Sequence, residues 1–221
     1  MNEIVKNYHS VKDDIHSELK QCPGENKSLQ LMVVSKFHGI ERIRPLLLEG
    51  HRIFGESRLD EAREKWIDLA REFTDIKLHY IGTLQSRKIK EIVKIFDVIQ
   101  SLDKEEAAAR IAREMQSQKR KIDCFIQINI GREPQKSGVL PENFECLFYQ
   151  CINKYNLNVS GIMCIPPAGE DPSTYFMEMK NIKDKYRLAE LSIGMSSDYL
   201  SAIKHGSTMV RVGAKILGER N

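Results

Sequence analysis

A lysine that directly follows an apolar stretch is the first candidate for chemistry in this sequence. Lys36 comes after the run Leu29–Ser35, so its amine should lie at the edge of a low-dielectric interior. Desolvation disfavours the charged form of a lysine and lowers its pKa. A neutral amine can attack an aldehyde and form a Schiff base. The competing interpretation is a lysine that only ends a strand and extends into solvent.

Two clusters of small residues near the end of the sequence could bind an anion. Gly194, Ser196 and Ser197 precede a predicted helix, and Gly213 and Ala214 follow a predicted strand. Small residues let backbone N–H groups approach an anion, and a helix N-terminus adds its positive end. Glycines that only make tight turns are the alternative. The clusters and the lysine together indicate a site for an aldehyde with an anionic tail.

An arginine lies inside the otherwise apolar run Met209–Leu217. A buried guanidinium needs a partner, because an isolated charge in a dry environment is very costly. Arg211 could form a structural ion pair within the fold, or it could donate to a ring nitrogen of an aromatic cofactor. In the second case its permanent charge keeps the ring nitrogen unprotonated, which makes the ring a poorer electron sink.

Short apolar runs, typical of parallel strands buried on both faces, alternate with amphipathic runs. The predicted strands are Leu29–Ser35, Arg52–Gly55, Lys77–Ile81, Val98–Ser101, Cys124–Ile130, Asn158–Met163, Leu191–Ile193 and Met209–Val212. The predicted helices are Ile40–Glu49, Leu59–Glu72, Gln85–Ile95, Glu105–Lys119, Glu142–Tyr155 and Thr174–Tyr186, with a seventh after Ser196–Asp198.

This alternation predicts an α/β fold, a single (β/α)8 TIM-type barrel with an extra N-terminal helix. An open doubly wound sheet is the alternative, but eight strands in 221 residues favour closure. We expect one domain over 1–221, with the helix at 1–20, over the barrel floor, and the barrel at 29–218. Function in such barrels lies at the carboxyl ends of the strands, with phosphate after strands seven and eight.

Helix caps can also be predicted from the sequence. Asp103 should cap the helix that follows it, with Glu106 as its capping-box partner, and Ser196, Ser197 and Asp198 should cap the seventh helix. Among the histidines, no spacing suggests joint catalysis, and His79 is interpreted as a satisfied core residue.

Composition excludes several classes of protein. The formal charge is only +3, from 34 basic and 31 acidic side chains, so we expect no nucleic-acid partner. No apolar run is long enough to span a membrane, and no signal peptide is visible, so we expect a cytoplasmic protein. We also expect a monomer. The five cysteines have no metal-ligand spacing, so we expect free thiols and no metal.

Motifs along nearly the whole sequence resemble one known family, the pyridoxal phosphate homeostasis proteins, which are similar in fold to the barrel domain of alanine racemase. The matching motifs are Val34-Ser35-Lys36, Phe54-Gly55-Glu56, His79-Tyr80-Ile81-Gly82, Leu84-Gln85-Ser86, Ser101-Leu102-Asp103, Gln127-Ile128-Asn129, Lys136-Ser137-Gly138, Gly161-Ile162-Met163, Leu191–Asp198 and Val210-Arg211-Val212-Gly213.

The resemblance implies that the cofactor is pyridoxal 5′-phosphate (PLP). Lys36 would be the Schiff-base lysine, and Arg211 would face the pyridine nitrogen. The other cofactor-binding residues implied are Ser57 near the ring, Met195 lining the pocket, and Ser196, Gly213 and Ala214 at the phosphate.

This sequence departs from the family pattern at three places. It has Phe37-His38-Gly39 where the family usually has Thr-Lys-Pro, Ser57 in place of Asn, and Ala214 in place of Thr. Ser57 removes an amide near the ring, and Ala214 removes one hydroxyl from the phosphate. We therefore expect somewhat weaker PLP binding than is typical of the family.

The function implied is intracellular PLP homeostasis without robust catalysis, with PLP-dependent apoenzymes as recipients of the cofactor. A PLP-dependent amino-acid racemase with weak activity is the alternative. Racemisation needs proton donors on both faces of the amino acid, and the sequence after Val212 is too short to contribute the second one. A Schiff-base aldolase acting on a sugar phosphate would share the lysine and the anion site without PLP.

Overall fold

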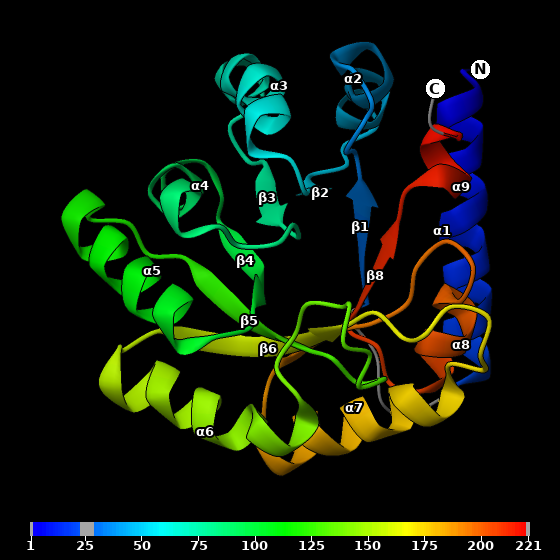
Figure 1. Cartoon of the computed structure of the whole chain (residues 1–221). Coiled ribbons are helices and arrows are strands. Elements are labelled where there is room, and N and C mark those ends of the chain that lie inside the picture. Colours follow the sequence, from blue (N-terminus) through cyan, green and yellow to red (C-terminus); the bar gives the residue numbers. More distant parts are fainter. Residues whose placement is uncertain (1, 23–28, 220–221) are drawn as a thin grey trace.

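The computed structural model describes residues 2–22 and 29–219, and its centre is a closed barrel of parallel strands (Figure 1). Neighbouring strands follow the sequence order, and β1 pairs with β8 to close the barrel. The strands are β1 (Gln30–Val34), β2 (Ile53–Glu56), β3 (Lys77–Tyr80), β4 (Val98–Leu102), β5 (Asp123–Ile128), β6 (Asn158–Cys164), β7 (Glu190–Ser192) and β8 (Met209–Val212). The predicted TIM-type barrel is confirmed, and the open sheet is excluded.

Helices surround the barrel (Figure 1). They are α1 (Glu3–Gln21), α2 (Ile40–Leu48), α3 (Leu59–Glu72), α4 (Ile89–Ile95), α5 (Glu105–Gln118), α6 (Phe144–Tyr149), α7 (Ser173–Lys185), α8 (Tyr199–Lys204) and α9 (Ala214–Leu217). Short turns precede α4 (η1, Ser86–Lys88) and α6 (η2, Pro141–Asn143), and a π-helical turn follows α6 (η3, Gln150–Lys154).

The single helix predicted over Glu142–Tyr155 is wrong, because η2, α6 and η3 divide this segment. The wide turn at its end has a clear hydrogen-bond signature. The N–H of Tyr155 donates to the carbonyl of Gln150, five residues earlier, at 3.2 Å. Apolar spacing does not distinguish such a π turn from a regular helix.

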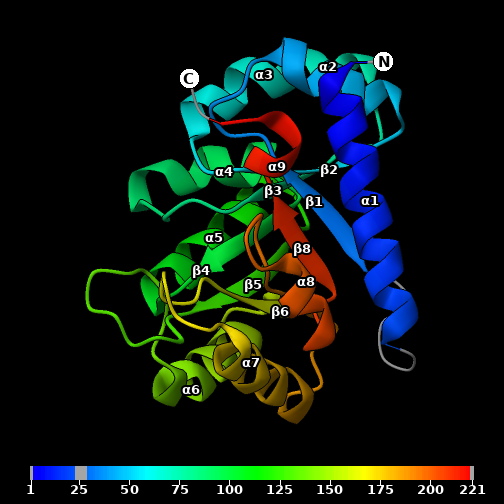
Figure 2. The same ribbon diagram turned by 90° about the vertical axis from the view of Figure 1, so that its right-hand side faces the viewer.

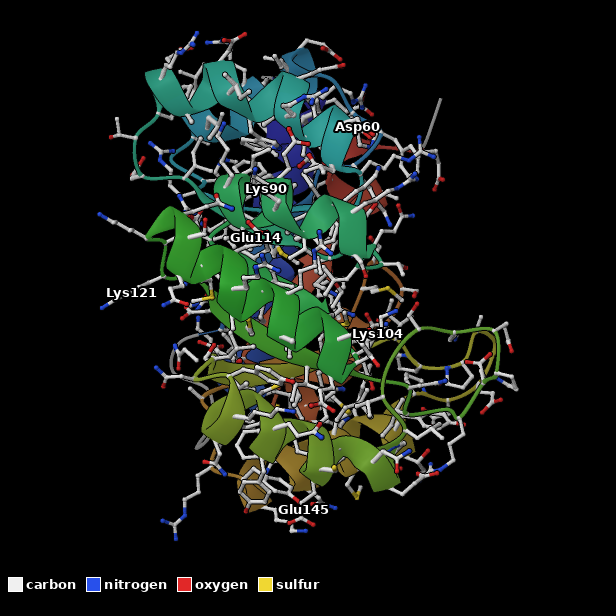
Figure 3. All side chains as sticks on the ribbon, turned by 60° about the vertical axis from the view of Figure 1, so that its left-hand side comes forward. Asp60, Lys90, Lys104, Glu114, Lys121 and Glu145 are labelled. Atoms are coloured by element: carbon white, nitrogen blue, oxygen red, sulfur yellow. The ribbon has the colours of Figure 1, made fainter. Side chains whose placement is uncertain are left out.

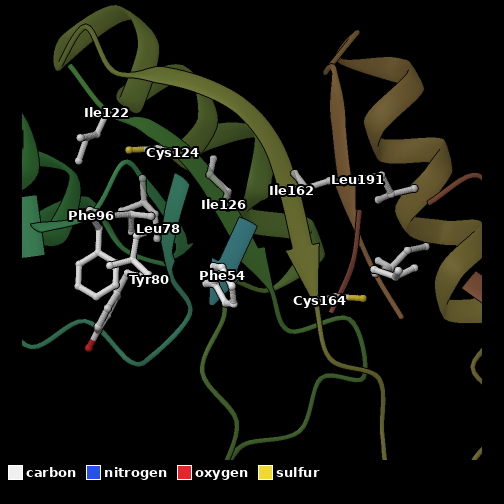
Figure 4. Packing of buried hydrophobic residues seen from close by; sticks show 14 of the residues in the cluster. Phe54, Leu78, Tyr80, Phe96, Ile122, Cys124, Ile126, Ile162, Cys164 and Leu191 are labelled. Atoms are coloured by element: carbon white, nitrogen blue, oxygen red, sulfur yellow. The ribbon is translucent and has the colours of Figure 1, made fainter. Parts of the chain in front are cut away.

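The strands alternate their side chains between the two faces of the barrel wall. Outward-facing residues such as Phe54, Leu78 and Ile126 pack under the helices in the main apolar core (Figure 4). Inward-facing Met32 and Phe125, together with Val98 and Met209, form a second cluster inside the barrel. The wall is therefore buried on both faces, which explains the continuous apolar runs in the sequence.

Helix α3 illustrates how the outer layer packs. Its buried residues include Leu59, Ala62, Trp66 and Leu69, which recur at spacings of three and four and form one face against the barrel. Charged side chains occupy the outer surfaces of the helical layer, as Figure 3 shows for Glu114 on α5. The amphipathic pattern thus orients each helix relative to the strand beside it.

Helix α1 lies along the flank of the barrel beside α8 and α9 (Figure 2). Asn2 caps it, with the side-chain oxygen accepting from the N–H of Ile4 at 3.0 Å. Asp14 joins it to the barrel by accepting from the Tyr199 hydroxyl at 2.6 Å and by pairing with Lys215 at 3.0 Å. The predicted N-terminal helix is therefore present, but the expectation that it covers the barrel floor is wrong.

The predicted helix caps at Asp103 and at Ser196–Asp198 are also wrong. Asp103 accepts from the N–H of Gly138 at 3.4 Å, and α5 begins after Lys104 without a side-chain cap. Asp198 precedes α8, but its carboxylate accepts from the N–H of Met195 at 2.5 Å and not from the helix. Both carboxylates therefore stabilise loops at the carboxyl ends of strands.

Across residues 2–22 and 29–219, no helix is both long and apolar enough to cross a membrane. The same residues contain no group of three His, Cys, Asp or Glu side chains arranged for a metal ion. All five cysteines lie in the described ranges, and none forms a disulfide.

Candidate functional site

A cavity of about 310 Å³ opens among the carboxyl ends of the barrel strands. Its volume lies at the lower end of the range for small-molecule sites. A larger groove of about 1000 Å³ lies among the amino ends of β3 to β6. We place the site in the smaller cavity because function in this fold lies at the carboxyl ends.

The cavity brings together most of the predicted cofactor-binding residues. Those that line it are Lys36, Met195, Ser196, Arg211, Gly213 and Ala214. Ser57 is the exception, since it lines a neighbouring pocket with Arg58 and Thr83. Residues from β8 and from the loops after β1, β7 and β8, distant in sequence, therefore meet at one opening.

Hydrogen bonds to neighbouring elements hold the turn that carries Lys36 in place. The Ser35 hydroxyl donates to the buried carboxylate of Glu56 at 2.8 Å. The ammonium of Lys65 donates to the carbonyls of Ser35 at 2.9 Å and of His38 at 3.1 Å. Half-buried Lys36 thus leaves β1 from a turn whose carbonyl groups are bonded to another element.

Phe37 has a strained backbone in this turn. Its φ is +70°, a left-handed conformation that side chains with a Cβ rarely adopt. Its N–H donates to the Glu61 carboxylate at 2.6 Å, and the guanidinium of Arg58 stacks on its ring at 4.3 Å. These contacts from α3 and from the loop before it stabilise the strained conformation.

The guanidinium of Arg211 is fully enclosed at the inner end of the cavity. One terminal nitrogen donates to the Ser192 carbonyl at 2.5 Å and to the Ser192 hydroxyl at 2.9 Å, and the other donates to the Cys164 carbonyl at 2.7 Å. Burial lowers the pKa of Arg211, although a guanidinium remains charged in proteins. The alternative of a structural ion pair does not hold among the described residues, because the partners of Arg211 there are carbonyl and hydroxyl oxygens.

Three of the five N–H groups of this guanidinium are therefore bonded to the barrel wall. Two remain without a partner among the described residues. Because Arg211 lines the cavity, these donors are suited to an acceptor on a bound molecule.

The loops after β7 and β8 bring small residues and backbone N–H groups to the cavity. The N–H of Gly213 donates to the Ser196 hydroxyl at 3.3 Å, which joins the loops after β7 and β8. Gly194 has a φ of +92°, and a Cβ there would lie 2.5 Å from the Cβ of Ala202. The turn thus requires glycine, and it brings Met195 and Ser196 to the cavity.

Five further residues with side chains line the cavity but were not predicted as site residues: Val34, His38, Ile81, Met163 and Ile165. His38 is buried, and burial is the main cause that lowers its pKa, followed by Arg42 and Lys65. Its position two residues after Lys36 is the signal that could have identified it. The apolar residues lie at the ends of β1 and β6 or directly follow β3 and β6, where they form the walls around the polar groups.

Comparison with known proteins agrees with this arrangement. Residues 16–221 match the family described as alanine racemase, N-terminal domain. The chain is 32% identical over 228 residues to the pyridoxal phosphate homeostasis protein of Pasteurella multocida, covering 99% of this chain and 98% of that protein. It is 30% identical to the protein of the same name from Escherichia coli, covering 100% and 98%.

Solved structures are similar as well. PipY from Synechococcus elongatus, in a structure with PLP bound, has a TM-score of 0.80 and 30% identity, covering 93% of this chain and 99% of that one. Alanine racemase from Clostridium difficile has a TM-score of 0.73 at 15% identity, covering 97% and 58%. The similarity to alanine racemase concerns the fold alone, and it does not favour the racemase alternative.

Proposed function

Because the chain belongs to the pyridoxal phosphate homeostasis family, we propose that it binds PLP and holds it as a Schiff base on Lys36. The observation that carries this proposal is the single cavity shared by Lys36, Arg211 and the loops after β7 and β8. Relatives named as homeostasis proteins also support a role in storing or delivering the cofactor, without robust catalysis.

The residues present fit the chemistry of the group. Arg211 retains two N–H donors for a ring nitrogen, and the Ser196 hydroxyl with the small residues Gly213 and Ala214 suits a phosphate. When bound, PLP supplies an aldehyde that reacts reversibly with amines. Met195 and Met163 supply apolar contact, and the permanent charge of Arg211 restrains carbanion chemistry.

The roles of the individual side chains follow from these positions. The amine of Lys36 reacts in its neutral form, and the bonds from Lys65 keep the turn beneath it in place. Ser196 and the amides beside it would orient the anionic end, and release would follow when water or the amine of a recipient displaces the Lys36 amine. We propose PLP-dependent apoenzymes as recipients and a monomer as the working state.

A spectrum followed by mass mapping tests the proposal. The protein with added PLP should develop a visible absorption band, and borohydride should attach the reduced cofactor to Lys36. Lys36→Ala and Lys36→Arg should abolish this modification, while Lys90→Ala, an exposed lysine on α4, should leave it unchanged. Modification of another lysine at equal stoichiometry in Lys36→Ala would refute it.

A further inference from the structure

Four polar side chains form a continuous hydrogen-bonded row inside the barrel. The guanidinium of Arg211 donates to the Ser192 hydroxyl at 2.9 Å, which donates to the carbonyl oxygen of the Gln100 amide at 2.8 Å. The amide nitrogen of Gln100 lies 2.8 Å from Nδ1 of His79. They come from β8, β7, β4 and β3, and none is more than 4% exposed.

The direction of these hydrogen bonds is fixed by chemistry. Arginine has no acceptor, so the Ser192 hydroxyl must accept from Arg211 and give its own proton to Gln100. The amide nitrogen of Gln100 then donates to Nδ1 of His79. Burial lowers the pKa of His79 to about 3, so the ring is neutral and carries its proton on Nε2.

A purely structural role does not explain the row well. Apolar Met32, Val98, Phe125 and Met209 fill the barrel interior beside it, and buried polar groups are costly unless every one is bonded. Nε2 of His79 has no partner among the described residues. The row therefore retains an unsatisfied donor at one end, and its other end is the arginine that lines the cavity.

We propose that Ser192, Gln100 and His79 are positioning residues that fix the guanidinium of Arg211 toward the cofactor. With its terminal nitrogens tied to Ser192 and Cys164, the guanidinium plane has one orientation, and its remaining donors keep a constant direction. This inference rests on the proposed function and deepens it, because it assigns control of the ring contact to residues that do not touch the ligand.

Substitutions along the row test the inference through the spectrum of bound PLP. Gln100→Met and Ser192→Ala should shift the absorption maximum and weaken PLP binding about tenfold, as expected for a charged hydrogen bond that has lost its geometry. Ser192→Thr keeps the hydroxyl and should restore both properties. Ser101→Ala removes a buried hydroxyl from the same strand as Gln100, outside the row, and should change neither.

A measurement without cofactor separates this inference from the proposed function. The ¹⁵N shifts of the His79 ring should report the Nε2–H tautomer in the wild type and a mixture in Gln100→Met. An Nδ1–H tautomer in the wild type would overturn the inference, as would Gln100→Met and Ser192→Ala proteins with unchanged spectra and affinities. A wild type that carries no PLP on Lys36 would instead refute the proposed function, with the tautomer result unaffected.

Discussion

The carboxylate of Glu56 and the ammonium of Lys65 form an ion pair of 2.7 Å directly behind the turn that carries Lys36. Both side chains are buried, and the same carboxylate oxygen accepts from the Trp66 indole at 3.1 Å. Burial raises the pKa of Glu56, while Lys65 pulls it in the opposite direction. The pair joins β2, α3 and the turn after β1 at one point.

We expect Lys65→Met to lower the free energy of unfolding by about 3–5 kcal/mol, because it leaves Glu56 buried without its partner. Urea unfolding measures this change. The double variant Glu56→Gln/Lys65→Met should recover part of the loss. Arg71→Met, which breaks an exposed pair with Asp68 on the same helix, should leave stability unchanged. Equal effects of Lys65→Met and Arg71→Met would contradict the prediction.

Arg211→Met should weaken PLP binding by roughly 10- to 100-fold, since hydrogen bonds to charged groups contribute about 1.5–3 kcal/mol. The long apolar side chain keeps much of the volume but removes every donor from the inner end of the cavity. Titration followed by absorbance gives the affinity, and borohydride should still attach the cofactor to Lys36. An unchanged affinity would show that the guanidinium does not contact the ring.

Ala214→Thr should tighten PLP binding about three- to tenfold, because it adds one neutral hydrogen-bond donor beside the phosphate. Ala214 is exposed, so the larger side chain can be accommodated there. Ser196→Ala should weaken PLP binding. Pyridoxal, which lacks the phosphate, is the control ligand, and its affinity should respond to neither substitution. Equal changes for both ligands would indicate a general effect on the cavity.

Stability should fall below neutral pH because of buried histidines. Burial lowers the pKa of His51 to about 4 and that of His79 to about 3, whereas an unfolded histidine titrates near 6.5. As the pH falls below 6.5, the unfolded state binds protons first. Between pH 6 and 4, each histidine should therefore lower the free energy of unfolding by up to about 1.4 kcal/mol per pH unit, and the contribution of His51 should decline as the pH approaches 4.

His51→Phe isolates one of these contributions. Between pH 6 and 4, the free energy of unfolding of this variant should change less steeply with pH than that of the wild type. The difference should equal the contribution of one histidine. The substituted ring retains the aromatic packing that His51 makes against Tyr8 and Phe54. Denaturant unfolding at several pH values gives both slopes, and parallel curves would contradict the assignment.

The sequence predicted the barrel because its strands are buried on both faces. Met209–Val212 has the same bounds in the structure, and the other strands differ by a residue or two at their ends. Interruptions within the helical layer could not be predicted, since the wide turn at Gln150–Lys154 preserves the apolar spacing. The helix-cap predictions were wrong because Asp103 and Asp198 accept hydrogen bonds from loop N–H groups. Only the folded barrel brings these groups near the two carboxylates.

Residues whose type was unusual in their run, such as Lys36 and Arg211, were predicted to share a site, and the structure brings them together at one cavity. No signal in the sequence pointed to the hydrogen bond between Ser192 and Gln100, because their inward direction emerges only when the sheet closes. His79 was interpreted as a satisfied core residue, but only one of its ring nitrogens has a partner among the described residues. Ser57 was expected at the ring, yet it lines the adjacent pocket.

Closure of the barrel by the pairing of β1 with β8 has a consequence for biosynthesis. Lys36 is synthesised before the ribosome reaches Arg211 and Gly213. A nascent chain that still lacks β8 has an amine but no guanidinium and no complete anion pocket. Chains truncated before β8 should therefore not retain PLP stably, and so should not withdraw it from the cell's supply.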